Sequence, residues 1–557
     1  MEKKFMSLIT TLVIVFIGIV TWIYVSPAPD PVTSATMSDI DADYAERFFD
    51  KNKVIDIYIT LEETDYKDIL ENPMAEEYKD AEITVDGVKV THVGLRTKGN
   101  SSLNSVARDD SERYSFKVDF NQYIQGQSLS GLTKLNLNNS FSDPSFMREY
   151  LSYSLLNDMG VATPAFGYAN LYINDELIGL YLAVEGLEEP FLESYYGSNY
   201  GTLYKPEGQG SDLIYVDDNI KSYSGIAPIA GYNNDSNGSL LKMLKALNEG
   251  TDLEKYLDIK QILKYFAVNT VLVNMDSYQS SLKHNYYLYE KDGIFTILPW
   301  DYNMSFGGFG MGGNNQDQTA LYIDQPVSGT TLEQRPLLGK LLEVEEYKDM
   351  YHSYIEEFIN GPFAADKMTA EIDRIANLIR PHIENDPSKF FTMEQFEQAL
   401  DEGGTEDSTE ASSRQPSPQG EANFKGGGNI MTRGNVIGLS RFIQERLNNV
   451  TQQLSGEIPS YGEASSQVIN IFADQSPGGN PPEGFPKGRE FPQNGEFPAG
   501  GEFPRGGEFP DREGFAGGRQ LTESETGMNS IYLTVGLITL LGAVIFLLFR
   551  KKNKHQI

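Results

Sequence analysis

The sequence FAVNTVLVNMDSYQSSLKHNYYLYEKDGIFTILPWDYNMSFGGFG, residues 266–310, is the stretch that decides the expected fold. Apolar residues recur at helical spacing from about residue 259, which predicts a helix that ends shortly before Asp276. Residues 285–290 and 294–298 then predict two strands of a β-hairpin, because the Lys-Asp-Gly between them favours a tight turn. A hairpin brings its open ends together, so the residues that flank it are expected to lie side by side.

Two carboxylates and one amide are associated with this hairpin. Asn285 begins it, Asp301 follows it, and Asp276 is expected nearby at the end of the approaching helix. Hard divalent cations take oxygen ligands, and Mg²⁺ commonly uses one or two carboxylates together with substrate phosphates. A single aspartate more often caps a turn, but Asp301 lies between Trp300 and Tyr302, where an ionised group is costly unless it is paired or bound to a metal. The cluster therefore predicts a divalent cation site beside a general base.

The same residues resemble the motifs of a known family. Asp276, His284-Asn285-Tyr286-Tyr287 and Pro299-Trp300-Asp301 are similar to the spore-coat protein H (CotH) kinase family of atypical protein kinases. The resemblance implies an α+β, two-lobed, kinase-like fold, with a β-rich N-lobe and a helical C-lobe. It also implies transfer of the γ-phosphate of ATP to Ser or Thr of a surface or spore-coat protein. In that reaction Asp276 is expected to be the catalytic base, and Asn285 and Asp301 are expected to bind Mg²⁺ or Mn²⁺.

The resemblance further implies nucleotide-binding residues in the first half of the chain. Arg96 and the sequence Gly99-Asn100-Ser101-Ser102 match the family's nucleotide-covering loop, and such a loop binds phosphates through backbone N–H groups. Lys117 resembles the strand lysine that a kinase directs at the phosphates, with Glu149 on a later helix as its acidic partner. Glu185 is expected near the nucleotide base. Read without the family, the loop is an ordinary turn, Lys117 an exposed strand lysine and Glu149 a solvated glutamate.

The order of the predicted elements agrees with this resemblance. Alternating apolar residues predict a strand at residues 54–61 and a strand pair at 81–90. Residues 93–120 are interpreted as a strand, a polar glycine-containing loop and a returning strand. From about residue 240 onward the pattern is mainly helical. The resemblance covers roughly residues 54–454, and the predicted metal cluster lies after the change from strands to helices.

Composition excludes several classes of function. The 557-residue chain has a formal net charge of −34, which argues against nucleic-acid binding because phosphate recognition needs a basic surface. It has no cysteine, so disulfides, thiolate nucleophiles and cysteine-ligated zinc are excluded. Its five histidines show none of the paired spacings that are typical of histidine-rich zinc sites.

Apolar segments at both ends predict a membrane protein. Residues 1–27 are interpreted as a signal peptide or an N-terminal membrane anchor, and residues 531–549 as a transmembrane helix followed by a basic cytoplasmic tail at 550–557. The kinase-like domain, residues 45–455, is therefore expected at the cell membrane on the extracytoplasmic side. Residues 456–530 carry phenylalanine at six-residue intervals in a Gly/Pro-rich background, which predicts an extended spacer. This repeat is also a candidate for binding a partner or a cell-wall polymer.

Two other functions stay open. Many family members carry a second acid two residues after the metal-binding aspartate, whereas this chain has Asn303. That difference leaves room for a non-catalytic pseudokinase, a surface module that binds wall polymer or coat proteins. A glycosidase with two carboxylates would need a sugar-binding cleft. The chain has only two tryptophans, Trp22 and Trp300, which makes such a cleft less favourable.

Overall fold

The computed structural model describes residues 44–109, 111–231, 235–309, 319–401 and 436–462. The chain divides into two units, residues 1–475 and 476–557, and the second unit lies wholly outside the described ranges. Most of the predicted phenylalanine-rich spacer also lies outside them. The domain boundaries expected from the sequence therefore stay predictions.

Seven strands of the N-terminal half form a closed barrel in the order β1-β2-β3-β4-β5-β7-β6, with the bounds β1 (Ile55–Leu61), β2 (Lys79–Val85), β3 (Val88–Lys98), β4 (Ser115–Asp119), β5 (Lys134–Asn138), β6 (Phe166–Ile173) and β7 (Glu176–Glu185). Burial alternates strictly along β1, as a two-residue side-chain period requires. The inward residues, among them Ile57, Leu95, Phe116 and Leu137, form the barrel core. Arg96 and Lys98 of β3 and Lys117 of β4, which alternate with these inward residues, consequently lie on the outer face.

The predicted two-lobed kinase-like fold flanked by membrane segments is wrong. In place of an open β-rich lobe, β1 pairs with β2 on one edge and with β6 on the other, so the sheet closes on itself. The closing pair is parallel and sets Ile55 opposite Ala169. Local alternation predicts individual strands, but it carries no information about such a long-range pairing.

The predicted location at the membrane also requires correction. Within the described ranges, none of the helices is long and apolar enough to cross a bilayer. The segments on which that prediction rested, residues 1–27 and 531–549, and the tail at 550–557 lie outside those ranges.

A second sheet has four antiparallel strands in the order β11-β10-β8-β9, with the bounds β8 (Thr202–Pro206), β9 (Ile226–Ala230), β10 (Tyr286–Lys291) and β11 (Ile294–Pro299). The predicted hairpin is confirmed, since Tyr286 pairs with Pro299 and Lys291 with Ile294. The predicted approaching helix is confirmed as α9 (Ile259–Val271), whose first turn is capped by the Asp258 side chain.

The other helices surround these two sheets. Short helices beside the barrel and near β9 are α2 (Tyr44–Phe48), α3 (Glu63–Glu71), η1 (Pro73–Ala75), α4 (Ser101–Arg108) and η2 (Ile220–Tyr223). The longer part of the chain adds α5 (Arg148–Asp158), α6 (Glu189–Tyr196), α7 (Ser236–Glu249), α8 (Leu253–Tyr256), α10 (Pro336–Leu342), α11 (Glu345–Asn360), α12 (Ala365–Asn385), α13 (Met393–Leu400) and α14 (Leu439–Leu454).

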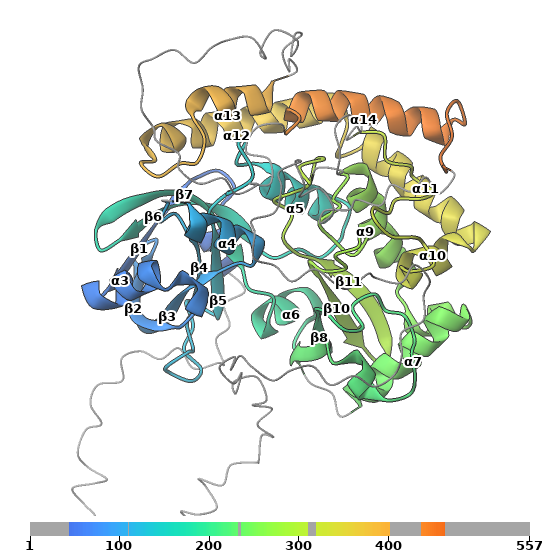
Figure 1. Cartoon of the computed structure of the whole chain (residues 1–557), viewed down its shortest axis with the longest axis horizontal. Helices are drawn as coiled ribbons and strands as arrows, with labels where there is room; N and C mark the ends of the chain where they lie inside the picture. The colour runs from blue at the N-terminus through green and yellow to red at the C-terminus, as the bar shows by residue number, and fades with distance from the viewer. Residues whose placement is uncertain (1–43, 110, 232–234, 310–318, 402–435, 463–557) are drawn as a thin grey trace, which may run out of the picture. The chain divides into compact units, whose positions relative to one another are not determined.

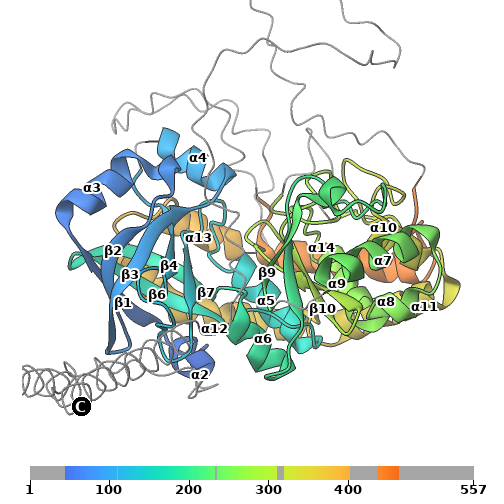
Figure 2. The same cartoon turned by 90° about the horizontal axis from the view of Figure 1, so that it is seen from below.

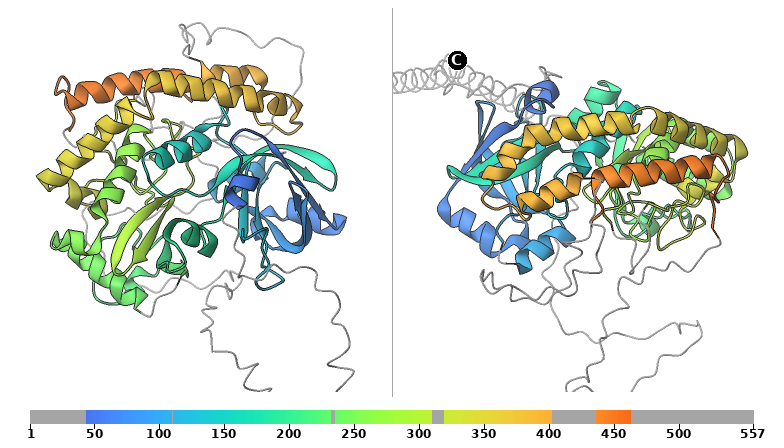
Figure 3. Two further views of the ribbon diagram at one scale, coloured as in Figure 1. Left: turned by 180° about the vertical axis from the view of Figure 1, so that it is seen from behind. Right: turned by 90° about the horizontal axis from the view of Figure 1, so that it is seen from above.

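Helix α5 lies centrally, between the barrel strands and the group formed by α7, α9 and α10 (Figures 1 and 2). Helices α12, α13 and α14 form one layer that runs above both parts (Figures 1 and 3). Arg446 of α14 is fully buried and donates to the carbonyl oxygen of Val271 at the end of α9. The layer therefore connects the barrel to the helix that leads into the predicted site.

A buried ion pair fixes the barrel against the end of α12. Arg113 Nη1 lies 2.8 Å from Asp386 Oδ2, and both side chains are fully buried. The backbone N–H of Leu180 donates to the same carboxylate oxygen at 2.9 Å. Gly179 has a φ of +149°, and a Cβ there would lie 2.2 Å from Arg113 Nη1. Only glycine therefore leaves room for this pair.

Candidate functional site

The segment between α9 and β10 carries the predicted base. Asp276 Oδ1 lies 2.6 Å from His284 Nε2, and the Asn285 side-chain N–H donates to the Asp276 carbonyl oxygen at 2.9 Å. Burial lowers the pKa of His284, but the hydrogen bond and charge of Asp276 and the charge of Asp301 outweigh it, so that its pKa is raised overall. The structure thus brings Asp276 and Asn285 together, as predicted, and adds His284 as the partner of the aspartate.

Two contacts hold this segment in place. Arg335 Nε donates to the carbonyl oxygens of Tyr278 at 2.8 Å and Ser280 at 3.0 Å. Lys283 forms an ion pair with Asp212 at 2.5 Å. The base therefore lies on a loop whose backbone is anchored, which favours a preorganised site.

Asp301 occupies the other side of the hairpin opening. Both Asp301 and Asn285 adopt positive φ, +56° and +55°, a conformation that Asp and Asn tolerate better than most residues. Burial raises the pKa of Asp301; Lys98 opposes this shift, whereas Asp276 adds to it. Since each of these charges affects Asp301, the three side chains form one electrostatic cluster.

A lysine and a glutamate from the barrel side complete the cluster. Lys98, the last residue of β3, donates to Asn138 Oδ1 at 2.7 Å, and Asn138 Nδ2 donates to Glu149 Oε2 at 2.8 Å. Burial lowers the pKa of Lys98, and the charges of Asp301 and Glu149 offset only part of this shift. Burial and the charge of Asp301 raise the pKa of Glu149 to about 7. Glu149 thus belongs to the cluster, as expected, but its lysine partner is Lys98.

The predicted strand lysine, Lys117, lies one strand away. It pairs with Arg96 across β3 and β4, on the outer face of the barrel, where burial and the charge of Lys134 lower its pKa to about 8. Arg96 forms an ion pair with Glu76 and donates to the Thr97 carbonyl oxygen at 2.9 Å. Arg96, Lys98 and Lys117 therefore share one cationic face. Sequence reasoning did not select Lys98, although its spacing of two residues from Arg96 predicts a common face.

The predicted loop at Gly99–Ser102 is partly helical. Asn100 is the N-cap residue of α4, and Ser101 and Ser102 form its first turn, directly after Lys98. Gly99 joins strand to helix with a φ of +125°. The first backbone N–H groups of a helix bind anions readily, so this arrangement retains the expected capacity for phosphate.

Glu185 is not part of the cluster. It lies on the inward face of β7, in register with Leu135, and accepts hydrogen bonds from the Tyr44 hydroxyl and, at 2.8 Å, from the Ala165 N–H. Burial raises its pKa to about 7. Its position in the structure is that of an anchor for α2 at the barrel end.

Asp301 and the side-chain amides close to it in the sequence or across the hairpin are the oxygen donors that a metal ion could use here. In the described part of the chain, no three acidic or histidine side chains come together as a ready-made metal site. Asn303, two residues after Asp301, buries its Oδ1 without a hydrogen-bond partner. Such a donor set suits a hard cation that takes its remaining ligands from substrate phosphates and water.

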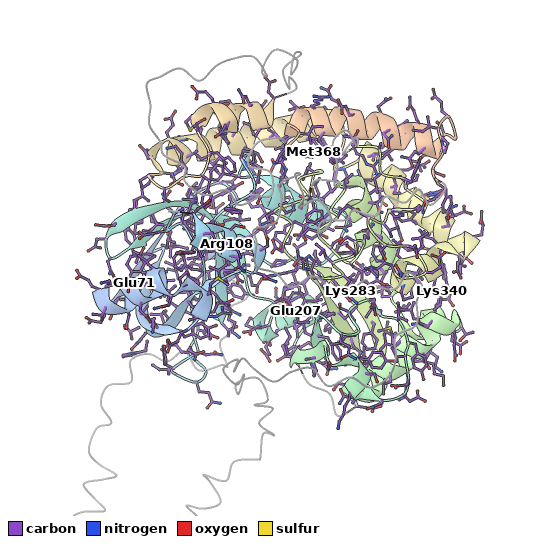
Figure 4. All side chains as sticks on the ribbon, viewed as in Figure 1. Glu71, Arg108, Glu207, Lys283, Lys340 and Met368 are labelled. Carbon is purple, nitrogen blue, oxygen red and sulfur yellow. The ribbon has the colours of Figure 1, made fainter. Side chains whose placement is uncertain are left out.

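Further charged groups surround this cluster. Glu207 contributes to the raised pKa of His284 and forms an ion pair with Lys205 at 2.6 Å. Glu207 and Lys283 lie in the central region of Figure 4, whereas Glu71 and Lys340 lie toward opposite edges. The cluster is thus bordered by paired charges of both signs.

Comparison with known proteins gives a consistent result. Residues 95–410, more than half of the chain, match the family described as CotH kinase protein. The chain belongs to the CotH family. The inner spore coat protein H of Bacillus subtilis (strain 168) is 23% identical over 305 residues, which cover 52% of this chain and 79% of that protein. The inner spore coat protein H-like protein of the same organism is 23% identical over 277 residues, 48% of this chain and 73% of that protein.

Proposed function

We propose that this CotH-family protein transfers the γ-phosphoryl group of ATP to a Ser or Thr hydroxyl of a protein. The observation that carries the proposal is the single cluster of Lys98, Glu149, Asp276 and Asp301. Phosphoryl transfer requires mainly positioning and neutralisation of charge, for which a lysine, a metal-binding aspartate and a base are the recurring parts. Family membership supports the same reaction class.

Asp276 is the proposed base. Its side chain is 16% exposed, so an incoming hydroxyl can reach it. His284 binds Oδ1 and leaves Oδ2 to accept the hydroxyl proton. The hydrogen bond and charge of Asp276 raise the pKa of His284 against the effect of burial, so the protonated imidazole and the carboxylate attract each other.

The nucleotide phosphates are proposed to lie along the outer face of β3 and β4. Lys98 is next to Asp301, while Arg96 and Lys117 lie one side-chain pair further along the strands. The N–H groups at the start of α4 follow Lys98 directly and provide neutral donors. In this proposal, cations lie beside successive phosphates.

Asp301 and Asn285 are the proposed ligands of Mg²⁺ or Mn²⁺, with the buried Asn303 oxygen close by in sequence. When bound, the cation neutralises charge on the phosphates. The Asn285 side-chain nitrogen donates a hydrogen bond to the Asp276 carbonyl oxygen. This bond orients the amide and leaves its oxygen as the atom that would bind the metal.

The names of the relatives support a spore-coat protein as the substrate class. A second candidate function, non-catalytic binding of a coat protein or a cell-wall polymer, is favoured by Asn303, which replaces the second acid found in many family members. Labelling and binding experiments distinguish the two.

The test is transfer of labelled phosphate from ATP by the purified protein, with Mg²⁺ or Mn²⁺, to itself or to a Ser-rich coat protein. Asp276→Asn and Asp301→Asn are expected to reduce transfer by at least about 100-fold. Asp349→Asn, an exposed aspartate of α11, is the matched control and should leave transfer unchanged. A folded wild-type protein that binds neither nucleotide nor metal, and transfers nothing, would exclude catalysis in favour of the binding function.

A further inference from the structure

Tyr153 connects two parts of the cluster that come from distant segments. It lies one helical turn after Glu149 on α5 and is fully buried. Its hydroxyl accepts the backbone N–H of Asp301 at 3.0 Å. Helix α5 thus carries both the glutamate that Asn138 links to Lys98 and the tyrosine that contacts the backbone of the proposed metal ligand.

These contacts form a path across the site. Hydrogen bonds join Lys98 to Asn138 at 2.7 Å and Asn138 to Glu149 at 2.8 Å, and one turn of α5 then leads from Glu149 to Tyr153, whose hydroxyl accepts the Asp301 N–H. The proposed phosphate-binding lysine and the proposed metal ligand are therefore the two ends of this path. Because a helical turn is a rigid element, it holds the two ends in a fixed relation to each other.

The Asp301 backbone depends on such a constraint. Its positive φ of +56° is a sparsely populated conformation for a residue other than glycine, and it persists where neighbouring groups hold it. The Tyr153 ring is itself fixed between Phe166 and Tyr302, with ring centroids 5.5 Å and 5.7 Å away. The hydroxyl therefore presents a rigid acceptor to the Asp301 N–H.

We propose that Tyr153 is a positioning residue that holds Asp301 ready for the metal and couples the metal ligand to Lys98. Nucleotide and metal then bind cooperatively, because both ends of the path must adopt one arrangement. This role rests on the proposed phosphoryl transfer and adds to it a residue that touches neither substrate nor metal.

The test compares Tyr153→Phe with the wild type in the full chain. Calorimetric titration with Mn²⁺, in the presence of a non-hydrolysable ATP analogue, is expected to show about tenfold weaker metal binding. Binding of the analogue without metal is expected to stay unchanged. Hydrogen–deuterium exchange is expected to become faster in the peptide that contains Asp301, because its N–H loses its acceptor.

Tyr168→Phe is the matched control. Tyr168 is equally buried in the same core, and its hydroxyl donates to the Phe146 carbonyl oxygen at 2.8 Å, away from the path. Both variants lose one buried hydrogen bond, but only Tyr153→Phe should alter Mn²⁺ affinity. If Tyr153→Phe does not fold, Glu149→Gln serves instead, since it weakens the same path and keeps the tyrosine ring in place.

Each outcome decides a different question. Unchanged Mn²⁺ affinity in a folded Tyr153→Phe, or an equal loss in Tyr168→Phe, overturns the positioning role and leaves phosphoryl transfer intact. A wild-type protein that binds no Mn²⁺ with the analogue and transfers no phosphate overturns both proposals.

Discussion

Lys98 and Glu149 are joined through the side-chain amide of Asn138, which accepts from the lysine at 2.7 Å and donates to the glutamate at 2.8 Å. In ordinary protein kinases the corresponding lysine and glutamate form a direct ion pair. An amide between them keeps both side chains in place without requiring both to be charged. The raised pKa of Glu149, to about 7, is consistent with such an arrangement.

Lys98→Met is expected to reduce kcat/KM for ATP by about 100-fold, because Lys98 is the cation beside Asp301. Lys117→Met, at the lysine that sequence reasoning selected, should give a smaller effect that is confined to KM for ATP. Steady-state kinetics of the two variants measures the difference. An equal loss in both variants, or a larger loss in Lys117→Met, would contradict the assignment of Lys98 as the main phosphate-binding lysine.

Gly179→Ala is expected to destabilise the protein by about 3 kcal/mol, since a Cβ would collide with the buried Arg113–Asp386 pair. Gly87→Ala is the control, because Gly87 also has a positive φ, +77°, but no atom lies within 4 Å of the added carbon. That change should cost only about 1 kcal/mol. Denaturant unfolding of both variants gives the comparison, and equal costs would show that backbone strain alone is responsible.

Glu185 is expected to make stability fall as pH rises. Its folded-state pKa, about 7, lies above the ordinary value of 4.5, so the folded protein retains a proton that the unfolded chain has lost. The contribution is fully favourable below about pH 4.5 and is lost as pH rises toward 7, by up to about 3 kcal/mol. Glu149 acts in the same direction over the same window.

Glu185→Gln isolates this contribution. The amide keeps an acceptor for the Ala165 N–H and does not titrate, so the melting temperature should change less between pH 5 and pH 8 than that of the wild type. Thermal unfolding at several pH values provides the measurement. If the melting temperatures of the two proteins change by the same amount between pH 5 and pH 8, Glu185 ionises in the folded protein without a cost in stability.

Arg335→Lys is expected to lower kcat by about tenfold or more with little change in KM for ATP, because a lysine lacks the planar guanidinium group that donates to the Tyr278 and Ser280 carbonyl oxygens in a fixed geometry and so fixes the Asp276 loop. Arg380→Lys is a suitable control, since Arg380 lies away from the Asp276 loop, where it forms an ion pair with Glu397 and donates to Asn377 Oδ1 at 3.1 Å. A rise in KM for ATP at constant kcat would instead place Arg335 in nucleotide binding.

Local patterns predicted the hairpin, the helix before it and the proximity of Asp276, Asn285 and Asp301. These features depend on residues close in sequence, where periodicity and turn chemistry decide the structure. The choice of Lys98 over Lys117 could not be predicted in this way. Both lysines lie on the outer barrel face, and Lys98 is selected by its contact with Asn138 and its proximity to Glu149, which come from later elements. The inward position of Glu185 could not be predicted for a similar reason, since it depends on the register of β7 with β5.

The closure of the barrel has a practical consequence for any fragment of this protein. The family match begins at residue 95, whereas β1, β2 and residues 88–94 of β3 precede it. A fragment cut at that boundary would leave β6 and the short remainder of β3 with unpaired edges, which favour aggregation. β1 can pair with β6 only after β6 has been synthesised, so the barrel closes late and we expect this half to fold slowly. We also expect folding to fail when the first strands are absent.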